Sequence, residues 1–243
     1  MHERRDELDL TKDSGQEGKE ELSLGKRLSR FGHRLCLEND FFSLKKVRGK
    51  TNTIRRFYDF LAPVYDLIYP RSTSYLDSAR HLAQNFVQPG DRVLDLGAGT
   101  GLLTKEMLPK ALSIISFDLH EKMLRQGQKK VLKEIRDAKL PSAGTGFCQG
   151  NALCLPFADN TFDLVATAFM LVYLTKEQKV DAIKEAKRVV RDDGRIVLLT
   201  FQGEIHPRFT PRAGWREVFE EAGLDEPLFD DFSEVFRTIS ITA

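Results

Sequence analysis

From Asp91 onward, apolar runs of strand length alternate with longer segments of helical periodicity. The short runs are almost continuously apolar, which is typical of strands buried on both faces of a sheet. Such alternation predicts βαβ units, in which a mostly parallel sheet carries helices on both faces. We therefore predict strands at Arg92–Leu96, Leu112–Asp118, Gly146–Gln149, Phe162–Ala168 and Arg195–Thr200. Helices are expected at Tyr75–Val87, Gly101–Leu108, Glu121–Asp137 and Lys176–Arg191.

The C-terminal end of the chain has a different pattern. A short amphipathic helix at Trp215–Gly223 is followed by two strand-like segments, Pro227–Phe232 and Phe236–Ala243, with a short turn between them. Because such a turn joins antiparallel strands, the last strand should run against the others. The sequence Asp192-Asp193-Gly194 predicts that the preceding helix stops in a turn before the strand at Arg195.

Composition excludes several classes of protein. Lys and Arg number 37 against 36 Asp and Glu, so the whole molecule is not an obvious binder of nucleic acid. No apolar run is long enough for a membrane span, and the charged N-terminus does not resemble a secretory signal. The cysteines Cys36, Cys148 and Cys154 form no zinc-ligand pattern, which predicts reduced thiols, no metal site and a cytoplasmic location.

Charge is unevenly distributed over the first part of the chain. Residues 1–21 hold eight acids against four bases with little apolar content, a composition typical of disorder. Residues 22–57 hold ten bases against two acids, with leucines and phenylalanines at helical spacing. Two interpretations stay open for this segment: it contacts an anionic membrane surface, or it packs on the domain as a lid. We predict a charged arm at 1–50 and a catalytic domain at 51–243.

The strongest local signal is a glycine-rich turn between a predicted strand and a predicted helix. Gly97, Gly99 and Gly101 permit a tight turn and close approach of the backbone to a ligand. Such a loop alone is ambiguous between a dinucleotide, a phosphate and an adenosyl ligand. The spacing differs from that of nicotinamide enzymes, and Lys105 does not complete a phosphate-binding loop. Asp95 suits a ligand that carries an amino group.

Polar residues end the next two predicted strands. Asp118 is placed to accept hydrogen bonds from both hydroxyls of a ribose, with an N-cap of the following helix as the alternative. Asn151 suits the amine of an adenine, supported by the backbone N–H of Ala152, with a plain turn as the alternative. Met123 lies against the adenine or in the core. His120 is interpreted as a helix-start residue rather than a catalytic one.

These features together resemble the class I S-adenosylmethionine-dependent methyltransferases, and within them the ubiquinone/menaquinone C-methyltransferase and phospholipid N-methyltransferase group. The resemblance covers about four-fifths of the chain. The matching segments are Phe57–Asp66, Val93–Gly101, Phe117-Asp118, Gln149–Ala152, Leu155–Phe157, Phe162-Asp163, Arg188-Val189, Gly194-Arg195 and Phe219–Gly223.

The resemblance implies a Rossmann-like, seven-stranded, mostly parallel sheet with an antiparallel last strand. It also implies S-adenosylmethionine as cofactor, with Tyr65 and Tyr58 folding over it from the N-terminal side. The full set of candidate cofactor residues is Tyr65, Asp95, Gly97, Ala98, Gly99, Thr100, Gly101, Asp118, Leu119, Met123, Asn151, Ala152, Ala168 and Phe169.

The methyl acceptor is less well defined by the sequence. Many relatives carry a His or an Arg-Asn pair after the fourth strand, where this chain has Val172 and Tyr173. This replacement indicates an apolar or lipid-like acceptor, or core packing alone, and argues against a quinol. In the short link Phe201–Pro207, Glu204 and His206 either reach a substrate or are exposed loop residues. No catalytic residue is predicted.

We expect a methyltransferase acting on a small-molecule or lipid-like acceptor. A non-catalytic S-adenosylmethionine-binding protein and a nicotinamide-dependent oxidoreductase are the alternatives. A nucleic-acid methyltransferase is disfavoured, because the domain lacks a basic face and the tetrapeptide motif that such enzymes carry after the fourth strand.

Overall fold

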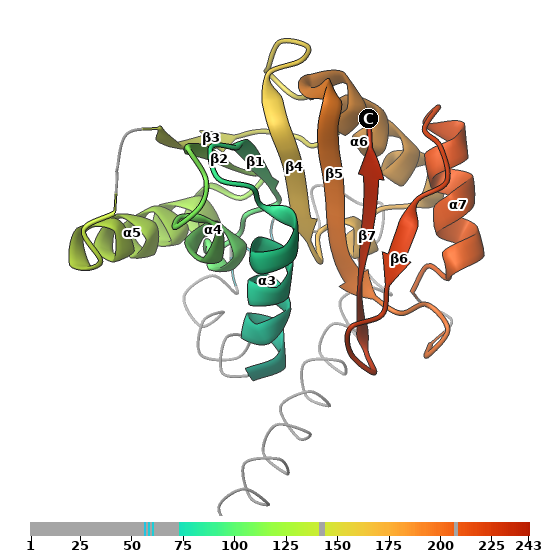
Figure 1. Cartoon of the computed structure of the whole chain (residues 1–243), viewed down its shortest axis with the longest axis horizontal. Helices are drawn as coiled ribbons and strands as arrows, with labels where there is room; N and C mark the ends of the chain where they lie inside the picture. The colour runs from blue at the N-terminus through green and yellow to red at the C-terminus, as the bar shows by residue number, and fades with distance from the viewer. Residues whose placement is uncertain (1–55, 57, 59, 61–72, 141–143, 207–208) are drawn as a thin grey trace, which may run out of the picture.

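The computed structural model describes residues 56, 58, 60, 73–140, 144–206 and 209–243 (Figure 1). The predicted arm at 1–50 and the candidate Tyr65 lie outside the described residues. The helices are α3 (Thr73–Phe86), α4 (Leu102–Met107), α5 (Glu121–Asp137), the short 3₁₀ turn η1 (Leu171–Tyr173), α6 (Lys176–Val189) and α7 (Arg212–Glu221). The strands are β1 (Arg92–Leu96), β2 (Ser113–Asp118), β3 (Thr145–Gln149), β4 (Phe162–Ala168), β5 (Val190–Phe201), β6 (Leu228–Asp230) and β7 (Phe236–Thr242).

The strands form one seven-stranded sheet in the order β3-β2-β1-β4-β5-β7-β6. Strands β1 to β5 pair in parallel, whereas β7 pairs with β5 in antiparallel register, with Leu198 opposite Ile239. The predicted fold class is confirmed, including the reversed last strand. Parallel neighbours need crossover connections, and helices follow β1, β2 and β4.

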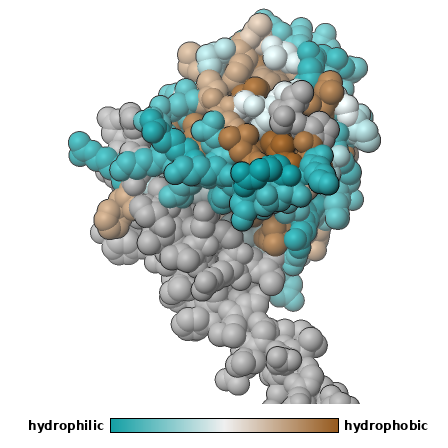
Figure 2. Space-filling view, turned by 90° about the vertical axis from the view of Figure 1, so that its left-hand side faces the viewer, coloured by the Kyte–Doolittle hydropathy of each residue, from teal (hydrophilic) through white to brown (hydrophobic). Residues whose placement is uncertain are grey.

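Each face of the sheet has its own apolar core, because side chains alternate between the faces along a strand. On one face, Val93 of β1 and Leu164 of β4 pack with residues of α3, α4 and α5. On the other face, Leu94 and Val165 pack with residues of α6 and α7 (Figure 1). The outer side of α5 is charged, and Figure 2, which views this side of the molecule, shows a band of hydrophilic side chains.

The parallel register brings the ends of neighbouring strands to one edge of the sheet. Leu96 pairs with Phe117, and Asp118 pairs with Gln149, so the segments after β1, β2 and β3 leave together. Ligands of open parallel sheets bind at this carboxyl edge. In the described parts of the chain, no helix is both long and apolar enough to cross a bilayer.

The predicted boundary between α6 and β5 was wrong. The expected turn at Asp192-Asp193-Gly194 lies inside β5, which begins at Val190, five residues before the predicted start. The pairing of β5 with β4 shifts register between Phe162 and Leu164, so a bulge absorbs the extra residues. A Cβ on Gly194 would lie 3.0 Å from the carbonyl oxygen of Asp163. The glycine therefore permits close strand contact rather than ending a helix.

Candidate active site

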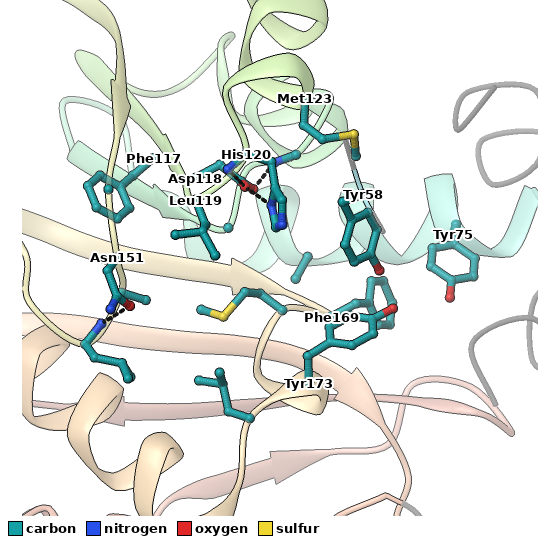
Figure 3. Close-up of a pocket in the computed structure, with 18 residues that line it drawn as sticks. Tyr58, Tyr75, Phe117, Asp118, Leu119, His120, Met123, Asn151, Phe169 and Tyr173 are labelled. Carbon is teal, nitrogen blue, oxygen red and sulfur yellow. Dashed lines mark hydrogen bonds and ion pairs between the residues drawn. The ribbon is translucent and has the colours of Figure 1, made fainter. Parts of the chain in front are cut away.

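A cavity opens at the carboxyl edge of β1, β2, β3 and β4 (Figure 3). It is open to solvent on one side and is lined mainly by apolar and aromatic side chains with a few polar groups, as small-molecule sites are. Its walls come from six segments of the chain, so folding is required to assemble them. The lining residues are Tyr58, Tyr75, Gly97, Gly99, Phe117, Asp118, Leu119, His120, Met123, Gly150, Asn151, Ala152, Leu153, Ala168, Phe169, Met170, Tyr173 and Leu174.

The glycine-rich turn forms part of the cavity wall through Gly97 and Gly99. Both have a positive φ, 80° and 55°, which glycine adopts without steric cost. A Cβ on Gly97 would lie 2.5 Å from the Cβ of Met170. The carbonyl oxygen of Phe117 accepts hydrogen bonds from the N–H groups of Gly97 and Ala98 at 2.7 and 3.0 Å, which holds the turn against β2.

The rest of the turn packs against α5 instead of the cavity. A Cβ on Gly101 would lie 3.0 Å from Val131, and a Cβ on Gly127 would lie 3.1 Å from the carbonyl oxygen of Gly99. Sequence reasoning missed Gly127, although a glycine inside a predicted helix interior is a signal of close packing. Gly127 therefore allows α5 to pack closely against the glycine-rich turn.

Asp118 holds the turn and the start of α5 together. Its Oδ2 accepts a hydrogen bond from the N–H of Gly99 at 2.8 Å. Its Oδ1 accepts one from the N–H of His120 at 2.8 Å and one from the Nδ1 of His120 at 2.7 Å. The N-cap of α5 is His120, so the N-cap interpretation of Asp118 was wrong. The carboxylate therefore links the glycine-rich turn to the start of α5. The residue is 7% exposed.

His120 occupies the helix start, as predicted, and also lines the cavity. The residue is 8% exposed, and its ring lies 5.1 Å from the ring of Tyr58, centroid to centroid. Among the described residues, its buried Nε2 has no hydrogen-bond partner. A buried polar atom without a partner is costly, so it points to a ligand group at this place.

Asn151 and Ala152 lie on the cavity wall beyond the end of β3. The side-chain oxygen of Asn151 accepts a hydrogen bond from the N–H of Leu153 at 3.1 Å, so the residue also performs the turn role that was its alternative (Figure 3). The preceding Gly150 is required because a Cβ there would collide with the ring of Phe117. Sequence reasoning did not include Gly150, Phe117 or Leu153 among the site residues.

The far end of the cavity is aromatic. Tyr58 meets Tyr173 edge to face at 5.5 Å, and Tyr75 lies 4.6 Å from Phe169. Phe169 has a positive φ of 59°, a strained conformation for a non-glycine residue that turns the chain at the end of β4. Its ring packs at 5.2 Å from Phe201, which extends this cluster away from the cavity.

Val172 and Tyr173, which stand where the resemblance predicted polar residues after the fourth strand, have different surroundings. Val172 is buried in the apolar core on the α3 face, whereas Tyr173 lines the cavity. Glu204 is absent from the cavity lining and pairs with the buried Arg237 at 3.0 Å. His206 is also absent from the lining.

Four candidate residues are not on the cavity wall: Asp95, Ala98, Thr100 and Gly101. Asp95 is 1% exposed, and its Oδ2 accepts a hydrogen bond from Thr104 at 2.5 Å. Burial raises the pKa of Asp95 to about 7, against the lowering effect of the Thr104 hydrogen bond. Asp95 is therefore a buried partner of Thr104 in α4 and does not face a ligand in the cavity.

The residues present fit an adenosyl ligand. The turn at Gly97 and Gly99 leaves backbone exposed where a side chain would fill the space, and Asp118 and Asn151 lie on the same wall. The partnerless Nε2 of His120 offers a further polar contact. The fold and this site define a class I adenosyl-binding domain.

Comparison with known proteins agrees with this class. The sequence profile of the family described as "Methyltransferase domain" matches residues 93–194. The chain is 30% identical over 174 residues to the ubiquinone/menaquinone biosynthesis C-methyltransferase UbiE of Legionella pneumophila, and 33% identical over 178 residues to that of Burkholderia mallei. In both cases the match covers 70% of this chain and 65% of the relative, so the chain spans less than two thirds of their length.

Solved structures share the fold at lower identity. An S-adenosylmethionine-dependent methyltransferase from Leishmania major has a TM-score of 0.63 and 15% identity, over 79% of this chain and 82% of that one. One from Aquifex aeolicus has a TM-score of 0.60 and 18% identity, over 74% and 96%. Residues 93–194 thus match a methyltransferase domain family, and the solved structures share the fold of this chain.

Proposed function

We propose that this chain transfers a methyl group from S-adenosylmethionine to a small apolar or lipid-like acceptor. The observation that carries the proposal is one cavity whose wall joins the glycine turn and Asp118 to the aromatic rings of Tyr58 and Tyr173. A methyltransferase needs such continuity, because donor and acceptor must meet within one pocket.

The cofactor residues are assigned by their places on the wall. Gly97 and Gly99 would hold the ligand against the turn, Asp118 the ribose, and Asn151 with Ala152 the adenine. The apolar lining residues beside them are Leu119, Met123, Ala168 and Phe169. Ala98, Thr100 and Gly101 do not line the cavity, so we assign them a structural role in the turn and no cofactor contact. When bound, the cofactor supplies a methyl group activated on a sulfonium sulfur.

The acceptor would lie against the aromatic end. Tyr58, Tyr75, Phe169 and Tyr173 offer ring faces and edges to a flat apolar molecule and help to exclude water. Alignment in a dry pocket contributes much of the rate of an in-line displacement, so no dedicated base is required. The UbiE relatives are named for C-methylation in quinone biosynthesis. A ring-shaped, quinone-like acceptor is consistent with this wall, although the Val172-Tyr173 pair departs from their polar pattern.

The division into an arm at 1–50 and a catalytic domain at 51–243 remains part of the proposal. The basic residues 22–57 would touch an anionic membrane surface, where apolar acceptors are dissolved. Sedimentation of the full chain with anionic but not neutral vesicles is expected. Equal recovery with both kinds of vesicle would contradict membrane contact and favour the lid.

Calorimetric titration tests the function directly. The wild-type chain should bind S-adenosylmethionine and S-adenosylhomocysteine, and NAD should not bind. Incubation with methyl-labelled S-adenosylmethionine and a fractionated extract should then transfer label to an apolar fraction. Binding without label in any fraction would favour the non-catalytic alternative, and binding of NAD alone would reject the proposal.

A further inference from the structure

Asp118 already carries three hydrogen bonds from the protein. They come from the N–H of Gly99, the N–H of His120 and the Nδ1 of His120, at 2.8, 2.8 and 2.7 Å. The two oxygens of an ionised carboxylate offer about four acceptor positions. One position is therefore left for a ligand, whereas the expectation that Asp118 accepts both ribose hydroxyls requires two.

The partners of Asp118 also determine which nitrogen of His120 carries hydrogen. A carboxylate accepts hydrogen bonds and donates none. The Nδ1 of His120 must then be the donor in the 2.7 Å contact. In the neutral ring, the other nitrogen, Nε2, is left with a lone pair and accepts a hydrogen bond.

This acceptor nitrogen belongs to the cavity wall beside Asp118. His120 lines the cavity, and its Nε2 is buried with no hydrogen-bond partner in the described parts of the chain. Figure 3 shows the ring between Asp118 and Tyr58, with Asn151 on the far side of Asp118. A ribose at Asp118 would thus have a second acceptor next to the first.

We infer that His120 accepts one ribose hydroxyl of the adenosyl ligand while Asp118 accepts the other. The inference rests on the proposed function and makes it more specific, because the pair Asp118 and His120 then selects a ligand with both ribose hydroxyls. His120 is a cofactor-binding residue in this arrangement, in addition to being the N-cap of α5.

A cycle of protein variants and ligand analogues tests this contact. The probes are S-adenosylhomocysteine and its 2′-deoxy and 3′-deoxy analogues, titrated by calorimetry into the wild type and His120→Phe. In the wild type, each analogue should bind about 10-fold more weakly than the parent, as expected for loss of one buried hydrogen bond. His120→Phe should bind the parent about 10-fold more weakly, lose nothing further with one analogue and still lose affinity with the other.

His81→Phe is the matched control. His81 also pairs with an aspartate, Asp230, at 2.8 Å, but neither residue lines the cavity. This variant should reproduce the wild-type affinities for all three ligands. If thermal melting shows that His120→Phe is unfolded, His120→Ala takes its place in the same cycle.

Two results would overturn the inference. If both analogues lose the same factor in the His120 variant as in the wild type, Nε2 contacts no ribose hydroxyl. If the wild type does not bind S-adenosylhomocysteine at all, the proposed function fails together with the inference. The two failures are distinguishable by the first titration.

Discussion

The end of the cavity at β1 and β2 is made of backbone and hydrogen bonds, whereas the end at β4 is made of aromatic rings. At the first end, Gly97 and Gly99 expose the main chain and Asp118 ties the turn to His120. At the second end, Tyr58, Tyr173 and their neighbours contribute ring surfaces. The first arrangement fixes one ligand through directed bonds, while the second selects by shape and apolarity.

This difference separates two kinds of specificity within one pocket. Directed hydrogen bonds leave buried groups unpaired when the ligand is wrong, so they discriminate strongly. Apolar surfaces discriminate weakly between molecules of similar size. We therefore expect the cofactor end to tolerate few substitutions and the aromatic end to tolerate changes that alter the acceptor preferred.

The largest expected effect is that of Asp118→Ala. The variant removes the acceptor of three hydrogen bonds and leaves the N–H of Gly99 and the Nδ1 of His120 without their partner. The ligand loses its ribose acceptor and the turn loses the carboxylate that holds it, so affinity for S-adenosylhomocysteine should fall about 100-fold by calorimetry, which corresponds to about 2.8 kcal/mol. Asp230→Ala, which removes the partner of His81, should not change it. An affinity of Asp118→Ala within threefold of wild type would contradict the assignment of this end.

Gly97→Ala should have the next largest effect. The new Cβ would lie 2.5 Å from the Cβ of Met170, at a positive φ of 80°. The turn must shift, and we expect about a 30-fold loss of S-adenosylhomocysteine affinity, which corresponds to about 2 kcal/mol. Gly90→Ala is the control, because Gly90 has a φ of 93° but nothing within 4 Å of an added Cβ. It should cost about 1 kcal/mol of stability in thermal melts and leave binding intact. Equal affinities of the two variants would show that the close contact does not matter.

The same contrast explains what could be predicted from the sequence. The glycines and Asp118 lie in one βαβ unit, so short-range pattern was enough to locate the cofactor end. The aromatic end combines Tyr58, Tyr75 and Phe169 from separate segments, and no local pattern shows that they meet. Only the fold brings such residues together.

The prediction for Asp95 shows a limit of motif reasoning. Asp95 belongs to the glycine motif, which suggested a ligand contact. Strand alternation places its side chain on the same face as Val93, toward Thr104 of α4 and away from the cavity. Period-two alternation was visible in the sequence and would have indicated this direction. The bulge at Gly194 was not visible, because it depends on the pairing of β5 with β4.

At the aromatic end, Tyr173→Ala should change transfer more than cofactor binding. The variant removes one ring from the wall while leaving Asp118 and the glycine turn unchanged. We expect S-adenosylhomocysteine affinity within twofold of wild type and about a 10-fold lower rate of label transfer to the apolar fraction. Val172→Ala, a change in the neighbouring core residue, should lower the melting temperature without this selective loss. If Tyr173→Ala weakens cofactor binding and transfer equally, the two ends are not separate.

The smallest expected effect on ligand binding is that of Asp95→Asn, which instead changes the dependence of stability on pH. Burial raises the pKa of Asp95 in the folded protein to about 7, from an ordinary value of 3.8. The folded state therefore holds this proton more tightly than the unfolded state, and the stability that it contributes is lost as pH rises toward 7. Between pH 5 and 8 the wild type should lose about 2 kcal/mol of unfolding free energy relative to Asp95→Asn, measured by urea denaturation. S-adenosylhomocysteine affinity should equal that of the wild type, because Asp95 is buried and does not line the cavity. Parallel stability profiles for the two proteins would mean that Asp95 is ionised in the fold. A large loss of S-adenosylhomocysteine affinity would indicate that Asp95 contacts the ligand.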